Sequence, residues 1–136
     1  MFIITKRFNF EAAHRLEDWP TDHQCHRCHG HSYQLIVALK DSTLLKGLDV
    51  VQDYGVISKI VKERIIDKYD HQYLNEILEV KNTTAEYLAF TFFYDLYEVF
   101  GKSLYYVEVK ETDNSSALYI PEVYERKETD NNVEGE

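Results

Sequence analysis

FIITKRFNFEA, residues 2–12, alternates apolar with polar residues, and HSYQLIVALK, residues 31–40, repeats the alternation. A period of two with many β-branched and aromatic residues is typical of antiparallel strands that bury one face. The short apolar run 48–51 follows a Lys-Gly turn and predicts a third strand. SLYYVEVKE (103–111) and SALYIPEVY (116–124) flank an Asp-Asn-Ser turn and predict a closing pair of strands.

Between these strands the apolar residues recur every three or four positions, which predicts two helices. The first runs from residue 53 to about 69, and the second opens at TTAE (83–86) and stops at Gly101. Thr83 and Glu86 have the spacing of a capping box at the start of the second helix. The order of elements predicts an α+β fold, an antiparallel sheet with two helices packed on one face.

The length of 136 residues indicates a single domain, which we place at residues 1–124. Residues 125–136 (ERKETDNNVEGE) carry charge without apolar periodicity, and we expect an acidic, disordered tail. This tail repeats the letters KETDN of residues 110–114. Only the first copy follows an alternating strand, so Glu128 receives no functional role.

Charge and hydropathy exclude two classes of function. A net charge of −9 argues against nucleic-acid binding, which needs clustered Lys and Arg. The chain has no apolar run near the ~20 residues that span a bilayer, and its alternating start does not resemble a signal peptide. We therefore expect a cytoplasmic protein with a small-molecule partner, and we expect the exposed sheet edges to be covered in a homo-oligomer.

A metal site is predicted by the histidines. His29 and His31 stand at i and i+2, so in a strand they project from the same face, roughly 7 Å apart. His14 ends the preceding strand, and antiparallel pairing brings it beside them. Three histidines with an open fourth position are typical of a catalytic Zn²⁺ site.

The two cysteines allow other hypotheses. Cys25 and Cys28, together with His29 and His31, have the spacing of a structural zinc knuckle. That arrangement fits less well, because a strand points the adjacent Cys28 and His29 to opposite faces and because it leaves His14 unexplained. A redox Cys-x-x-Cys pair is weaker still, since no β-α-β unit places the motif before a helix.

Six motifs occur in a characteristic order: FEAAHRL, C-x-x-x-HGHSY, DYGVISKI, YDHQYLN, TTAE and VEVKETDN. From about residue 5 to residue 120 the chain resembles the 6-pyruvoyl-tetrahydropterin synthase and 6-carboxytetrahydropterin synthase family. The resemblance implies the tunnelling fold (T-fold), in which the sheets of several subunits close into a barrel with pterin sites at the interfaces. A homo-oligomer, by this resemblance a hexamer, is the expected assembly.

The resemblance also implies roles for individual residues. His14, His29 and His31 match the zinc ligands, and Cys25 matches the catalytic thiol. The acid/base pair corresponds to Asp70 and His71. Substrate-binding positions correspond to Glu111, which grips the pterin edge, and to Thr84 in the TTAE segment near the pterin.

The branch of the family is indicated by spacing. Cys-x₃-His resembles the carboxy branch, and Cys25 stands where a folate-type branch has glutamate. The TDN after Glu111 resembles the pyruvoyl branch instead. The resemblance therefore favours a zinc-dependent 6-carboxytetrahydropterin synthase of queuosine biosynthesis, which converts 7,8-dihydroneopterin triphosphate with release of acetaldehyde and triphosphate. A pyruvoyl-type enzyme and a non-catalytic zinc-dependent pterin-binding module remain alternatives.

Overall fold

The structure is a computed structural model that describes residues 1–122. The strands are β1 (Phe2–His14), β2 (His29–Asp41), β3 (Gln72–Tyr73), β4 (Leu104–Thr112) and β5 (Ser115–Tyr119). The α-helices are α1 (Tyr54–Val61), α2 (Asp67–Tyr69), α3 (Leu74–Leu78) and α4 (Ala85–Phe100). Three further helical segments are the π-helical turn η2 (Lys62–Ile66) and the 3-10 turns η1 (Gln24–His26) and η3 (Gly101–Ser103). The predicted tail at residues 125–136 lies outside the described residues.

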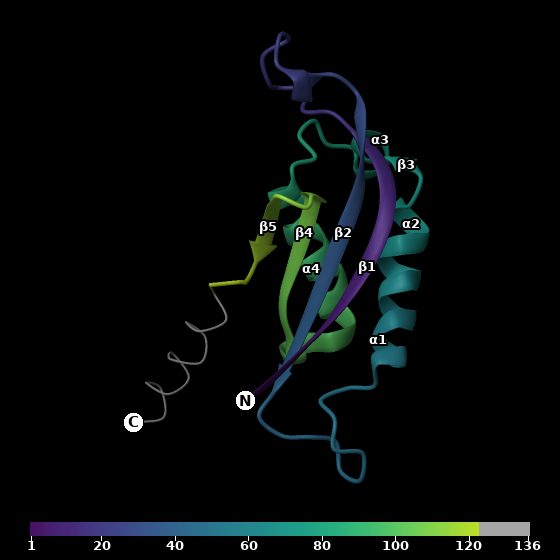
Figure 1. The fold of residues 1–136 in the computed structure, drawn as a ribbon, viewed down its shortest axis with the longest axis vertical. Helices are drawn as coiled ribbons and strands as arrows, with labels where there is room; N and C mark the ends of the chain where they lie inside the picture. The colour runs from purple at the N-terminus through teal and green to yellow at the C-terminus, as the bar shows by residue number, and fades with distance from the viewer. Residues whose placement is uncertain (123–136) are drawn as a thin grey trace.

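The five strands form one sheet in the order β3-β1-β2-β4-β5. All neighbours are antiparallel except the two-residue β3, which runs parallel to β1. Helix α1 packs against β1 and α4 packs against β4, so the helices cover one face of the sheet (Figure 1). The α+β prediction with helices on one face is confirmed.

The long hairpin of β1 and β2 determines where the site lies. Its register pairs His14 with His29 and Ala12 with His31 across the two strands. Side chains directly opposite each other in an antiparallel pair have Cβ atoms about 4.5–5.5 Å apart. The three histidines therefore come together at the end of the hairpin, as the sequence predicts.

The core lies between the sheet and the two long helices. Period-two alternation buries Phe10 and Ala12 of β1 on the helix side, while Glu11 between them is exposed. The helices contribute residues at helical spacing, with Ile57, Val61, Ile65, Leu88, Phe92 and Leu96 all fully buried. This packing holds the hairpin rigidly enough to place side chains at its end.

Several predicted elements differ in the structure. Residues 48–51 form no strand: Leu45 N donates to Val50 O, which closes a turn, and Leu48 is 67% exposed. A four-residue stretch with three apolar residues (Leu48, Val50 and Val51) was too short to distinguish a strand from a turn. The last strand ends at Tyr119 and does not reach residue 124, because Pro121 has no N–H for a ladder bond.

The first predicted helix, residues 53–69, is interrupted by the π-helical turn η2. The segment after it contains β3 and α3, which were not predicted, because elements of two and five residues carry no usable periodicity.

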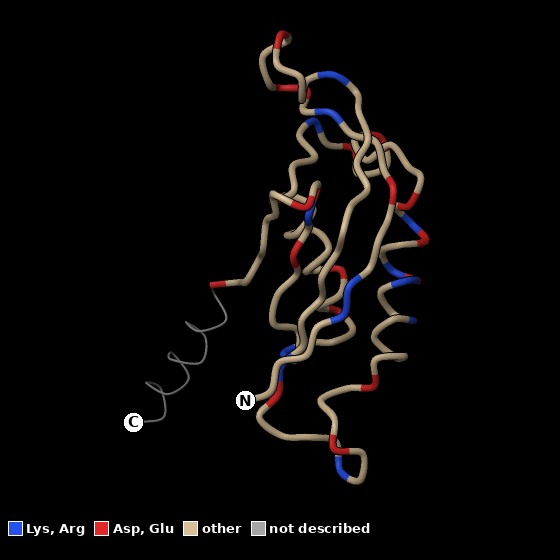
Figure 2. The backbone as a smooth tube through the Cα atoms, in the orientation of Figure 1, with Lys and Arg blue, Asp and Glu red and all other residues tan. Residues whose placement is uncertain are grey.

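Within residues 1–122 every helix is too short or too polar to cross a membrane. Lys and Arg are interspersed with Asp and Glu along the tube of Figure 2.

Candidate active site

Three imidazole rings form a triangle at the end of the hairpin. The ring centroids of His14, His29 and His31 are 4.5, 4.8 and 4.9 Å apart, and the rings are steeply inclined to one another. One nitrogen from each ring lies within 4.8 Å of the other two, and in residues 1–122 this is the group of His, Cys, Asp and Glu side chains arranged to hold a metal ion. Zn–N bonds are about 2.0–2.1 Å long, so small ring rotations bring all three nitrogens onto one ion.

The partners of the far ring nitrogens fix the orientation of two rings. His14 Nδ1 lies 2.9 Å from Thr83 O, and His29 Nδ1 lies 2.6 Å from Arg27 O. A carbonyl oxygen only accepts, so each Nδ1 carries the hydrogen and each Nε2 keeps its lone pair. Metal-binding histidines in proteins are held in this way.

The Nε2 atoms of two of the rings make no hydrogen bond within residues 1–122. His14 Nε2 and His31 Nε2 are buried and without a hydrogen bond to any residue of the described range. A buried polar atom left unpaired costs about 1–3 kcal/mol, which a bound metal ion would relieve. The donor set and its orientation therefore fit a metal ion.

Burial favours the neutral form of two of these imidazoles, those of His14 and His31. His14 is 1% exposed, and desolvation, with smaller contributions from His29 and His31, lowers its pKa from 6.5 to about 4. Desolvation and the neighbouring His29 also lower the pKa of His31. Neutral imidazole is the form that binds a metal, so the ligands are ready at neutral pH.

Glu111, near the end of β4, is brought to the triangle. Its carboxylate oxygens lie 3.7 Å from His31 Nε2 and 4.0 Å from His14 Nε2. Burial raises the pKa of this half-buried carboxyl group. The structure thus places a carboxylate whose side chain is 29% exposed beside the three imidazoles.

Asp70 and His71 form a directly hydrogen-bonded pair. His71 Nδ1 lies 2.9 Å from Asp70 Oδ2, and Asp70 Oδ1 accepts from the backbone N–H of Glu11 at 2.8 Å. That backbone bond, and then the bond to His71, lower the pKa of Asp70. His71 has φ of +61°, a conformation rare outside glycine, and its side chain is 76% exposed. An imidazole held by a carboxylate through one ring nitrogen is equipped for proton transfer.

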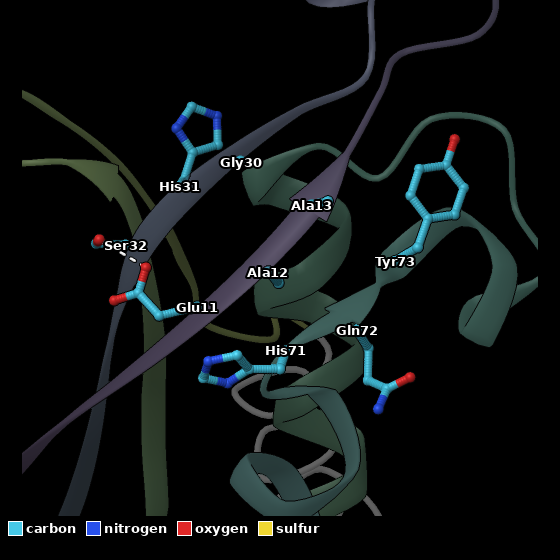
Figure 3. Close-up of a pocket in the computed structure, with 9 residues that line it drawn as sticks. All are labelled: Glu11, Ala12, Ala13, Gly30, His31, Ser32, His71, Gln72 and Tyr73. Carbon is cyan, nitrogen blue, oxygen red and sulfur yellow. Dashed lines mark hydrogen bonds between the residues drawn. The ribbon is translucent and has the colours of Figure 1, made fainter.

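A hollow of about 460 Å³ lies between the hairpin and the segment that contains His71 (Figure 3). Its polar lining includes Glu11 and Ser32, whose hydroxyl donates to Glu11 Oε2 at 2.7 Å. The rings of His31 and His71 both border the hollow but do not point toward one another (Figure 3). Within one chain, the His71 ring is therefore not directed at the His31 ring.

The cysteines lie in the loop that joins β1 to β2. Cys25, in η1, is half-buried, and its backbone N–H donates to His23 Nδ1, while Cys28 is exposed. Neither thiol belongs to the metal-binding group found in residues 1–122, which contains His14 instead. This composition favours the three-histidine site over the zinc knuckle.

The residue that caps α4 differs from the one that the capping-box spacing predicts. Thr84 is the N-cap, because its hydroxyl accepts from Tyr87 N, so the prediction of Thr83 as the cap is wrong. The fully buried Thr83 instead contacts His14 through both its carbonyl and its hydroxyl. A role of Thr84 in substrate binding stays a prediction.

Sequence reasoning assigned no role to Glu11, Ser32 or Asn75 in this region, and it gave Thr83 only the role of a helix cap. Glu11 and Asn75 stand inside the quoted motifs FEAAHRL and YDHQYLN, which was the available signal. Nothing in their spacing indicated which side chains they contact, because those contacts join distant parts of the chain.

The chain is similar to known proteins over nearly its whole length. The family model described as 6-pyruvoyl tetrahydropterin synthase matches residues 3–122. A Synechocystis protein named 6-carboxy-5,6,7,8-tetrahydropterin synthase is 35% identical over 123 residues, covering 88% of this chain and 94% of the relative. A Dictyostelium discoideum protein named 6-pyruvoyl tetrahydrobiopterin synthase is 30% identical, covering 86% and 94%.

Solved structures support the same fold. The 6-pyruvoyl tetrahydropterin synthase of Caenorhabditis elegans superposes with a TM-score of 0.78 at 25% identity, covering 88% of this chain and 95% of that one. An uncharacterized Wolinella succinogenes protein has a TM-score of 0.75 at 20% identity, covering 89% and 98%. The T-fold topology expected from the sequence is thus confirmed for the single chain.

Proposed function

Because the chain belongs to the 6-pyruvoyl tetrahydropterin synthase family, we propose that it is a zinc-dependent lyase that acts on 7,8-dihydroneopterin triphosphate. The product is 6-carboxytetrahydropterin, formed with release of acetaldehyde and triphosphate, as a step in queuosine biosynthesis. The observation that carries the proposal is the triangle of His14, His29 and His31 with its inward-facing nitrogens. The name of the Synechocystis relative supports the carboxy branch.

Zinc is the metal we propose for the triangle, since three neutral imidazoles with an open position suit it. When bound, it supplies a Lewis acid that polarises oxygens of the substrate side chain and makes the adjacent C–H bond acidic. Thr83 and Arg27 hold two of the rings through their backbone carbonyls, so the ligands need little reorganisation.

The pterin ring is recognised by Glu111 in this proposal. A carboxylate can accept two parallel hydrogen bonds from the amino group and ring N–H of a pterin. The Glu111 oxygens lie 3.7 Å from His31 Nε2 and 4.0 Å from His14 Nε2, so the carboxylate and the metal ligands border the same site. The ring is thereby oriented with its side chain toward the metal position.

Protons are moved by Cys25 and by the Asp70–His71 pair. Cys25, four residues before the ligand His29, is the base that takes a proton from the activated carbon. Asp70 holds His71 through the Nδ1 atom of the imidazole, so the Nε2 atom of His71 exchanges protons with the substrate. Both roles follow the family resemblance, and the contact between His71 Nδ1 and Asp70 Oδ2 supports the second of them.

We propose that the active protein is a homo-oligomer, a hexamer, with sites between subunits. In residues 1–122, β3 pairs only with Ala12 and Ala13 and leaves most of the outer edge of β1 without a strand, and β5 is the other edge. Such edges favour pairing with further copies. Because the rings of His31 and His71 do not face one another within a chain, an interface would let His71 of a second copy serve the triangle.

The deciding experiment incubates the purified, zinc-loaded protein with 7,8-dihydroneopterin triphosphate and identifies the products. Acetaldehyde together with 6-carboxytetrahydropterin supports the proposal. Triphosphate release with a pyruvoyl product and no acetaldehyde identifies the second candidate, which the Dictyostelium relative and the TDN after Glu111 favour. Pterin binding without any turnover contradicts both and indicates a binding module.

A further inference from the structure

We propose that Asn75 is a positioning residue for the metal centre, which acts through Thr83 to fix the ring and the tautomer of His14. The proposal rests on the proposed metal site. Asn75 is 5% exposed, Thr83 is fully buried and His14 is 1% exposed, so the three side chains form a hydrogen-bonded chain inside the protein. It runs from α3 through the residue before the N-cap of α4 to the end of β1.

The amide of Asn75 makes four hydrogen bonds, all that it can make. Its Oδ1 accepts from Arg15 N and from the Thr83 hydroxyl, each at 3.0 Å. Its Nδ2 donates to Arg15 O at 2.7 Å and to Lys81 O at 2.9 Å. Two backbone carbonyls and one backbone N–H therefore fix which end of the amide is oxygen.

This arrangement determines what Thr83 can offer His14. A hydroxyl has one hydrogen, and here it is donated to Asn75 Oδ1. Toward His14 Nδ1, at 3.2 Å, the Thr83 hydroxyl can then act only as an acceptor. The Thr83 carbonyl at 2.9 Å is also an acceptor. Both partners require a hydrogen on Nδ1, so Nε2 is left with its lone pair for a metal ion.

Asn75 also fixes the position of the ligand. It binds both backbone groups of Arg15, the residue that follows His14, and thereby clamps the end of β1 beyond its ladder. Without Asn75 the Thr83 hydroxyl can rotate and donate to Nδ1, which would stabilise the wrong tautomer. Loss of such partners of metal-binding histidines typically costs 10–100-fold in metal affinity.

The test compares Asn75→Ala, Thr83→Val and Thr83→Ser with Asn82→Ala as the matched control. Asn82 lies in the loop between α3 and α4, and its amide makes two hydrogen bonds, both to Asp18 and neither to Thr83. Zinc affinity is measured by chelator competition, unfolding by urea, and the His14 tautomer by ¹⁵N NMR of the metal-free proteins.

We expect Asn75→Ala and Thr83→Val to lower zinc affinity by about tenfold or more. Thr83→Ser restores the hydroxyl and should stay within about threefold of the parent, as should Asn82→Ala. Asn75→Ala should also show a mixture of His14 tautomers, where the parent shows only the Nδ1–H form. A merely structural asparagine would lower the urea midpoint without changing the tautomer.

Parental zinc affinity in a folded Asn75→Ala protein, or an equal loss in Asn82→Ala, would overturn the proposal. If Asn75→Ala does not fold, the zinc affinity of Thr83→Val is the deciding measurement. Parental zinc affinity in Thr83→Val would likewise overturn the proposal. If the parent protein itself binds no zinc, the proposed function fails. The tautomer comparison still tests the positioning role, because it uses metal-free protein.

Discussion

Acid should destabilise the metal-free protein through the buried imidazole of His14. Burial lowers its pKa from 6.5 to about 4, so below pH 6.5 the unfolded chain binds a proton that the folded chain refuses. Stability is therefore full above pH 6.5 and falls as the pH falls toward 4. A shift of this size corresponds to a loss of about 3 kcal/mol in the free energy of unfolding once the pH is below 4.

The assay is urea unfolding in the presence of a chelator, at fixed protein concentration and at several pH values between 7 and 4. The variant His14→Gln provides the comparison, because its amide does not titrate. Burial raises the pKa of Glu111, so this carboxyl group makes the free energy of unfolding change with pH in the opposite direction. Glu111 is present in both proteins, so its contribution cancels in the comparison. The parent should lose about 3 kcal/mol more than the variant over this range. Parallel stability curves for the two proteins would refute the reasoning.

Three further predictions follow from the proposed function. Cys25→Ala should keep zinc and pterin binding but lose on the order of 10²-fold in turnover, whereas Cys28→Ala should stay active; the reverse result would show that the thiol is misassigned. Glu111→Ala should abolish pterin binding, followed by fluorescence titration, while zinc content stays unchanged, and Glu108→Ala on the same strand should leave both unaltered. Light scattering should give a homo-oligomer larger than a dimer, and a stable monomer with full turnover would contradict sites shared between subunits.

The hairpin and its histidines could be predicted because two simple regularities determine them. Period-two alternation states which residues of a strand share a face, and this places His29 and His31 together. Antiparallel pairing of two consecutive strands joins the end of one to the start of the next, and this brings His14 to them. No knowledge of the helices was needed for either step.

The supporting residues could not be predicted because their contacts are long-range and their local patterns are ambiguous. Thr83 and Thr84 are equally good helix caps by residue type, and only the packing of α4 against the sheet leaves Thr83 facing His14. His71 has a left-handed backbone conformation, and its backbone N–H donates to Glu11 O, which lies far away in the sequence. Tertiary contacts of this kind leave no trace in hydrophobic periodicity.

The metal content of the purified protein tests the central claim most directly. Elemental analysis should find about one zinc per chain in the parent, as expected for a single three-histidine site. The zinc should be lost in His29→Ala or His31→Ala, weakened in His14→Ala and retained in Cys28→Ala. Full zinc occupancy in His14→Ala combined with loss in Cys28→Ala would contradict the account and indicate the zinc knuckle instead.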